Sequence, residues 1–479
     1  MLRNQMLPFG DWLPDQPDFG NAVQVVRNAI PQAKSYRSVR SLQIVSNALD
    51  SACLGSEWAK GADGTYYVFS GDAGKLYLLS GTTFSDVSKA GGYTSTGWEF
   101  VIWGNRVIAS SIDEPMQYYD LGTSTLFADL PGSPPKAKHV AVVRDFIVTG
   151  NIDDGGTVYP YRLRWSGFNN SEQWGSSQAA QSDYQDLFGR GGAIKHITSG
   201  ETALIFQEHS IRRMTYVGPP LIFRIDEIES DRGLYASNSV AQSGDTVYYY
   251  SHDGFFVKQG NNPSMPIGAE KVDRFFAGDL QGDSIDLVYG AIDRRNKMVC
   301  WTYPSKTTGV NRIIVYRWDI KKWGLFDIDA PLIVEASSPT YYLDDLDLIL
   351  GADIDTYSIN VDSDGYAGGV VSLFAFNSSN QLCTFSGDDE TAIIETGEVD
   401  GRISVKSARP ITDGTVSLSV GTRNTQSANY SYGAAQTENA KNEMNFRTSA
   451  KYHRFKATIS GGFNHAQGIE VIYREEGRK

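Results

Sequence analysis

The chain has 479 residues, and 43 Lys and Arg stand against 56 Asp and Glu, a formal net charge of −13 at pH 7. This length exceeds one ordinary compact core, so we expect one large domain with appendages, or two to three domains. The acidic balance argues against ordinary DNA binding, in which Lys and Arg release counterions from the phosphates. It does not exclude DNA that passes along a repelling acidic surface.

Composition also favours an all-β chain, because aromatic residues make up 12% and there are 48 glycines and few helix-type periodic stretches. Residues 1–20 lack the cationic start and apolar core of a secretory signal, and no apolar stretch is long enough for a membrane span. Cys53, Cys300 and Cys383 are odd in number and far apart, which argues against a disulfide framework. We therefore expect folding in a reducing cytoplasm.

Residues 1–45 are predicted to form an extended N-terminal arm. The segment from Pro8 to Phe19 is rich in proline and aromatic residues, a composition typical of a segment that packs on another surface. Large aromatic side chains give much contact area at low entropic cost. We therefore predict Phe9, Trp12 and Phe19 as anchors of a contact with a neighbouring subunit or with the body of the chain.

Residues 46–390 carry a repeat: a short turn with an acidic or amide residue, followed at once by an apolar run rich in β-formers. The turn residues are Asp63, Asn105, Asp145, Glu201, Asp245, Asn296 and Asp347. Their intervals are 42, 40, 56, 44, 51 and 51 residues. A period of about 40–50 residues is typical of a β-propeller blade of four strands, so we predict six or seven blades with these turns in equivalent places.

Two alternatives bear on this repeat. Any all-β chain has a turn about every 8–12 residues, so some apparent period is inevitable. A strand from the first 45 residues is also expected to close a propeller by pairing with the last blade, and this is compatible with an arm.

After Glu390 the pattern changes to polar and apolar residues in alternation, in five or six strand-like segments. Residues 391–479 are therefore predicted to form a small C-terminal β-sandwich. The charge changes at the same point. Residues 391–479 contain 12 basic and 9 acidic residues, which leaves 31 basic and 47 acidic residues for the body.

Motifs that could carry chemistry are incomplete. Residues 360–365 (NVDSDG) resemble half of a calcium loop, but Val371 stands where a bidentate Glu is needed, and an Asx-rich turn fits better. Residues 251–256 begin like a sialidase turn but lack its Thr-Trp, and residues 189–192 (GRGG) lack the Lys-Ser/Thr of a phosphate loop. The histidines show no pair at metal spacing: His139, His196, His209, His252, His453 and His465. We predict no catalytic, cofactor or metal residues, and no enzymatic activity.

The two ends of the chain resemble tail hub or nozzle proteins of short-tailed bacteriophages, also called packaged-DNA stabilisation proteins. Near the start the likeness is carried by residues 9–15 (FGDWLPD), 28–31 (NAIP) and 36–37 (YR). Near the end it is carried by residues 395–398 (ETGE), 408–410 (ARP), 419–423 (SVGTR), 452–459 (YHRFKATI) and 464–471 (NHAQGIEV). The middle matches only as a succession of blade-like units, so the specific resemblance covers roughly a third of the chain.

This resemblance implies a structural virion protein, hexameric in the tail and assembled in the host cytoplasm. It implies contacts with the portal, adaptor and other tail proteins, and double-stranded DNA that passes through the lumen without specific binding. An alternative is a receptor-binding tail propeller that binds or cleaves carbohydrate, which a carboxylate pair and aromatic faces would serve. A third is a monomeric intracellular scaffold propeller.

Overall fold

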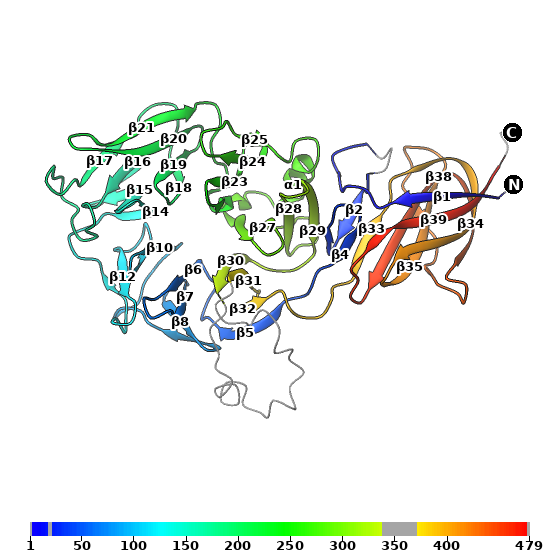
Figure 1. Cartoon of the computed structure of the whole chain (residues 1–479), viewed down its shortest axis with the longest axis horizontal. Coiled ribbons are helices and arrows are strands. Elements are labelled where there is room, and N and C mark those ends of the chain that lie inside the picture. The colour runs from blue at the N-terminus through cyan, green and yellow to red at the C-terminus, as the bar shows by residue number, and fades with distance from the viewer. Residues whose placement is uncertain (1, 18–21, 338–370, 477–479) are drawn as a thin grey trace, which may run out of the picture.

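The computed structural model describes residues 2–17, 22–337 and 371–476. Within these ranges the chain forms seven four-stranded antiparallel sheets and one eleven-stranded sheet. The seven sheets succeed one another around a common centre, and the eleven-stranded sheet lies at one side of them, at the right of Figure 1. The prediction of an all-β chain with a propeller is confirmed, and the number of blades is seven.

Each blade is a meander of four strands, numbered here from the centre outward. Blade 1 contains β6 (Gly55–Lys60), β7 (Tyr66–Gly71), β8 (Leu76–Ser80) and β9 (Thr83–Asp86). Blade 2 contains β10 (Glu99–Trp103), β11 (Arg106–Ser110), β12 (Gln117–Asp120) and β13 (Ala128–Asp129). Blade 3 contains β14 (Lys136–Val143), β15 (Phe146–Asp154), β16 (Thr157–Trp165) and β17 (Asp183–Asp186). Blade 4 contains β18 (Ile194–Ile197), β19 (Thr202–Gln207), β20 (Ile211–Gly218) and β21 (Ile222–Glu229).

The remaining blades follow the same plan. Blade 5 contains β22 (Ala241–Ser243), β23 (Thr246–Ser251), β24 (Gly254–Gln259) and β25 (Met265–Pro266). Blade 6 contains β26 (Tyr289–Asp293), β27 (Met298–Pro304), β28 (Asn311–Arg317) and β29 (Lys322–Phe326). Blade 7 contains β30 (Leu332–Ser337), β31 (Val371–Phe376), β32 (Gln381–Thr384) and β5 (Gln43–Ala48). One α-helix, α1 (Asp273–Asp279), and two 3₁₀ turns, η1 (Ser237–Ser239) and η2 (Ser284–Leu287), occur in the described ranges.

The ring is closed by a strand from the other end of the chain. β5 pairs antiparallel with β32, with Ala48 opposite Gln381 and Gln43 opposite Thr384. The last blade therefore takes its outermost strand from the N-terminal part of the sequence. The boundary predicted between residues 45 and 46 falls inside β5.

The repeated turns join the first strand of a blade to the second. Asp63, Asn105, Asp145, Glu201, Asp245 and Asn296 occupy this place in blades 1–6, and Asp347 lies outside the described residues. The apolar run after each turn is the second strand, for example β19 and β23, which are buried at every residue but the first. Neighbouring blades cover both of its faces, which explains why these runs are continuous rather than alternating.

Three of the turns are two-residue hairpins. Trp103 pairs with Arg106, Val143 with Phe146 and Ser243 with Thr246. The first turn residue has a positive φ in each case, as the hairpin turns that match strand twist require. These residues are Gly104 (φ 61°), Arg144 (φ 52°) and Gly244 (φ 59°).

Both ends of the chain build the eleven-stranded sheet, which we call the terminal sheet. From the start come β1 (Leu2–Pro8), β2 (Val25–Arg27), β3 (Ala29–Pro31) and β4 (Tyr36–Ser38). From the end come β33 (Ala392–Glu395), β34 (Val399–Thr412), β35 (Thr415–Arg423), β36 (Ser431–Tyr432), β37 (Gln436–Thr437), β38 (Met444–Ser460) and β39 (Ala466–Glu475). The long β38 pairs with β34 over its first part (residues 444–453), and with both β33 and β35 over its last part (residues 456–459 and 452–460), so the strands form one branched sheet. The predicted two-sheet sandwich is therefore not confirmed.

The arm connects the terminal sheet to the propeller. Trp12 is 2% exposed and belongs to a continuous core that includes Trp323 of blade 6 and Val471 of the terminal sheet. Its ring meets Phe275 of α1 edge-on at 5.2 Å. The Asp15 carboxylate accepts hydrogen bonds of 2.8 Å from the backbone N–H groups of the first turn of α1, a capping contact supplied from far away in the sequence. No helix in the described ranges is both long and apolar enough to cross a membrane.

We expect Trp12→Ala to lower the free energy of unfolding by about 3–5 kcal/mol, because the cavity would open where the arm, α1 and the terminal sheet meet. Trp12→Phe should cost clearly less, because it keeps a ring and loses mainly the Nε1 hydrogen bond to the Gln24 carbonyl. Chemical denaturation of both variants measures the difference. Equal unfolding midpoints for the alanine variant and the wild type would contradict this role of Trp12.

Candidate functional site

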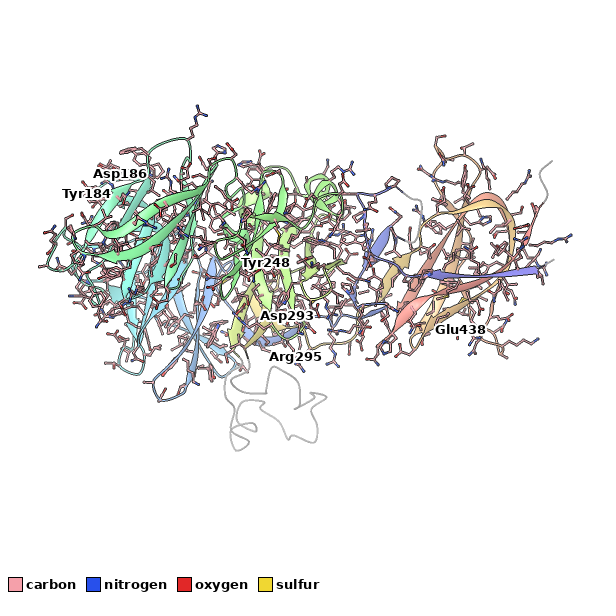
Figure 2. The ribbon with its side chains drawn as sticks, turned by 45° about the horizontal axis from the view of Figure 1, so that its top comes forward. Tyr184, Asp186, Tyr248, Asp293, Arg295 and Glu438 are labelled. Atoms are coloured by element: carbon pink, nitrogen blue, oxygen red, sulfur yellow. The ribbon has the colours of Figure 1, made fainter. Side chains whose placement is uncertain are left out.

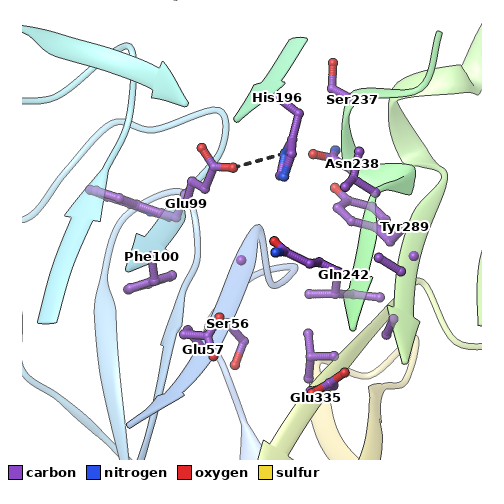
Figure 3. Close-up of a pocket in the computed structure, with 18 of the residues that line it drawn as sticks. Ser56, Glu57, Glu99, Phe100, His196, Ser237, Asn238, Gln242, Tyr289 and Glu335 are labelled. Atoms are coloured by element: carbon purple, nitrogen blue, oxygen red, sulfur yellow. Dashed lines mark ion pairs between the residues drawn. The ribbon is translucent and has the colours of Figure 1, made fainter. Parts of the chain in front are cut away.

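A polar channel runs between the first strands of the seven blades. The cavity there has a volume of about 370 Å³ and is lined by residues of β6, β10, β14, β18, β22, β26 and β30. Figure 3 shows its acidic, amide, hydroxyl and imidazole groups converging from several blades. Because every blade contributes, this axial cavity collects side chains that are far apart in the sequence.

The ionisable side chains occupy related positions in the repeat. Glu57, Glu99 and His139 each stand six residues before the turn residue of their blade, and His196 stands five residues before Glu201. Their first strands β6, β10, β14 and β18 are neighbours in the ring. The regular geometry of the blades thus places these four side chains side by side around the axis.

Glu99, His139 and His196 form one cluster. The Nδ1 atom of His139 lies 3.4 Å from Oε2 of Glu99, and Nδ1 of His196 lies 3.5 Å from Oε1 of the same carboxylate. One potential ligand atom from each residue lies within 4.8 Å of the others. The carboxylate is also held by the backbone N–H of Val140 at 2.7 Å. Among the residues that the structure describes, these three form the group that could hold a metal ion.

Burial and charge set the protonation of the cluster. Burial acts to raise the pKa of Glu99, but contact with His139 and the nearby imidazoles outweigh it, so this pKa lies below its ordinary value. Burial lowers the pKa of His196 to about 4, against an opposing effect of the Glu99 carboxylate. At neutral pH an ionised carboxylate therefore faces a neutral His196 imidazole, and both are the forms that bind metals.

A second acidic pair, Glu57 and Glu335, lies on the neighbouring side of the channel (Figure 3). Burial raises the pKa of Glu57 to about 7, and the negative charge of Glu335 adds to the rise against a hydrogen bond from the Trp58 N–H. Burial also raises the pKa of Glu335, although Arg294 lies 3.2 Å from it and opposes the shift. The pair can hold a proton near neutral pH.

The predicted anchors lie elsewhere. Phe9 and Trp12 are 4% and 2% exposed and are covered by their own chain, and Phe19 lies outside the described residues. Their role in a contact with a second subunit stays a prediction. The incomplete calcium loop at residues 360–365 also lies outside the described residues.

The histidine prediction from the sequence missed the cluster. His139 and His196 are 57 residues apart, so no local spacing relates them. The turn repeat contained part of the signal, because counting back six residues from the turn residue aligns Glu57, Glu99 and His139, whereas His196 is offset by one residue. A second pair, His209 and His252, stacks with ring centroids 5.5 Å apart, and His252 is exposed.

No protein-family model and no curated protein matched the chain. Solved structures with a similar fold include the WD40 domain of Pan2 from Neurospora crassa, with a TM-score of 0.38 and 7% identity over 64% of this chain and 91% of that one. The β-propeller domain of Cps50 (Swd1) from Myceliophteria thermophila has a TM-score of 0.36 and 10% identity over 63% of this chain and 98% of that one. The computationally designed Ika8 protein has a TM-score of 0.37 and 12% identity over 72% of this chain and 99% of that one. These values carry no argument about function. The resemblance to phage tail hub proteins stays a prediction.

We expect Glu57→Gln to stabilise the protein more at pH 8 than at pH 5, by about 1–2 kcal/mol. The folded state holds the Glu57 proton up to about pH 7, whereas the unfolded state releases it near the ordinary value of 4.5. Stability is therefore lost as the pH rises between these values, and the neutral amide removes this loss. Denaturant unfolding at the two pH values measures the effect.

The matched control for this experiment is Glu438→Gln. Glu438 is an exposed carboxylate beside the terminal sheet (Figure 2). Because its side chain is exposed, its replacement should change stability little at either pH value. A Glu57→Gln effect that is also independent of pH would contradict a raised pKa in the channel.

Proposed function

We propose that this chain is a structural virion protein that forms a hexameric ring in the tail of a short-tailed bacteriophage. In this role it is the hub or nozzle that closes the portal channel on packaged DNA and conducts the DNA during ejection. The role is structural rather than enzymatic. The observation that carries the proposal is the assembly of the two ends of the chain into one terminal sheet.

The segments with the likeness to tail hub proteins come from opposite ends of the sequence, yet they meet in this sheet. Residues 29–31 in β3 pair with residues 36–38 in β4, and Tyr36 lies opposite Ala466 of β39. The Phe9 N–H donates a hydrogen bond of 2.8 Å to the Gln467 carbonyl of β39. From the other end of the chain, β33 pairs with β38. The resemblance thus falls on a single structural unit, which supports a shared role for that unit.

Charge supports the same proposal. Residues 391–479, which supply most strands of the terminal sheet, have 12 basic and 9 acidic residues, whereas the remainder has 31 and 47. An acidic body repels a polyanion, so a ring lined by it would let DNA pass without holding it. The propeller axis is no candidate path for a duplex, because the space there is a cavity of about 370 Å³ between the first strands of the seven blades. In the proposed ring, DNA would instead pass through the central lumen that the subunits surround.

The terminal sheet also offers an edge for assembly. Among the described residues β1 pairs with β39 alone, and its apolar side chains Leu2 and Met6 are 61% and 43% exposed. A strand with a free edge is a ready site for pairing with another chain. We assign this edge to the contact with a neighbouring subunit.

Native mass spectrometry tests the ring. We expect an assembly of six chains of 52.7 kDa each at micromolar concentration, and a smaller assembly when Leu2→Glu and Met6→Glu are combined. Leu126→Glu is the matched control, because Leu126 is 50% exposed but lies in the propeller between β12 and β13. A wild-type monomer would contradict the proposal. A trimer that binds or cleaves a glycan would favour the receptor-binding alternative.

A further inference from the structure

The cluster of Glu99, His139 and His196 has the composition of a transition-metal site. Imidazole nitrogen and carboxylate oxygen are ligands that Zn²⁺ accepts, and three protein ligands are sufficient when water fills the remaining position. The three side chains come from the first strands of blades 2, 3 and 4, which are neighbours around the channel. A metal there would join three blades that are otherwise separate sheets.

The distances in the cluster fit a shared ion better than hydrogen bonds. The two nitrogen-to-oxygen distances are 3.4 and 3.5 Å, whereas an ordinary N–H···O hydrogen bond spans about 2.7–3.2 Å. Ligand atoms about 2.0–2.2 Å from a tetrahedral zinc ion are roughly 3.3–3.5 Å from one another. Each distance is close to one edge of such a tetrahedron, with the two imidazoles facing different oxygens of the same carboxylate.

Burial gives an independent reason to expect a ligand. His139 is 4% exposed, and its Nε2 atom has no hydrogen-bond partner among the described residues. Buried polar atoms are nearly always paired, so this imidazole is incompletely satisfied by the protein alone. Its other nitrogen, Nδ1, is the one that faces the Glu99 carboxylate. The Val140 N–H bond to Glu99 orients the carboxylate, as outer-shell contacts do in metal sites.

We propose that Glu99, His139 and His196 bind one divalent transition-metal ion in the propeller channel, with Zn²⁺ the ion that fits best. The ion ties the first strands of blades 2, 3 and 4 together and leaves a coordination position open to the channel. This site is independent of the tail role, because it depends only on the propeller. Hard cations such as Mg²⁺, which prefer several oxygen ligands, are not expected to compete for it.

To test this proposal, the full chain is first freed of metal with a chelator. It is then titrated with ZnCl₂ at pH 7.5. We expect one Zn²⁺ per chain by calorimetry, unchanged by millimolar Mg²⁺. Titration with CoCl₂ should give visible absorption bands of low-symmetry coordination, and a rise in melting temperature should accompany Zn²⁺ binding. Absence of stoichiometric binding of either ion would overturn the proposal.

Variants locate the site. Glu99→Gln keeps an oxygen that accepts the Val140 N–H, and His196→Asn alters a side chain that is only partly buried, so both should fold. Each is expected to weaken Zn²⁺ binding at least about tenfold and to abolish the Zn²⁺-dependent rise in melting temperature. Circular dichroism of the metal-free variants checks the fold.

His252→Ala is the matched control, because it removes one histidine from the other close pair, which His209 and His252 form. It should leave Zn²⁺ binding unchanged. Loss of binding in His252→Ala together with retention in Glu99→Gln and His196→Asn would place the metal outside the channel and overturn the proposal.

Discussion

The fold depends on closure of the propeller by β5. This strand pairs with β32 across more than three hundred residues of sequence, and without it blade 7 would lack its outermost strand. Closure places the seven first strands around one axis, and this brings together side chains from the first strands of different blades. The cluster of Glu99, His139 and His196 is thus a consequence of ring geometry, because each residue belongs to a different sheet.

The same constraint explains what could be predicted from the sequence. Second strands are covered on both faces by neighbouring blades, so their apolar runs after Asp63, Asn105 or Asp245 were visible in the sequence alone. The terminal sheet was predicted less well. Its strands β34 and β38 have 14 and 17 residues, and the pairing between them shifts register near Asp400 and Val405. Alternation of polar and apolar residues is local, so it indicates strands but not which partners a long strand joins.

The arm shows a second limit of sequence reasoning. Proline and aromatic residues predicted a segment that packs on another surface, and Trp12 packs on α1 and the terminal sheet of its own chain. The same composition would serve a neighbouring subunit equally well, because aromatic burial has the same energetic benefit in either place. Whether the arm packs on its own chain or on a neighbour depends on which surface is complementary to it, and that surface is created by the tertiary fold. Asp15 illustrates the point, since it caps α1 from about 260 residues away.

The channel at the propeller axis is likewise created by the tertiary fold. Between blades 4 and 5 the 3₁₀ turn η1 packs against β18 and against β26, so the inner ring is interrupted there by a turn. Blades 2, 3 and 4, by contrast, place Glu99, His139 and His196 in contact range at the axis. Carboxylate and imidazole side chains are costly to bury without partners, yet this chain collects them where water has limited access. Their mutual arrangement offsets that cost for Glu99, because one imidazole faces each of its two oxygens. This shared carboxylate is what makes the axis, rather than the blade surfaces, the place to look for a bound ion.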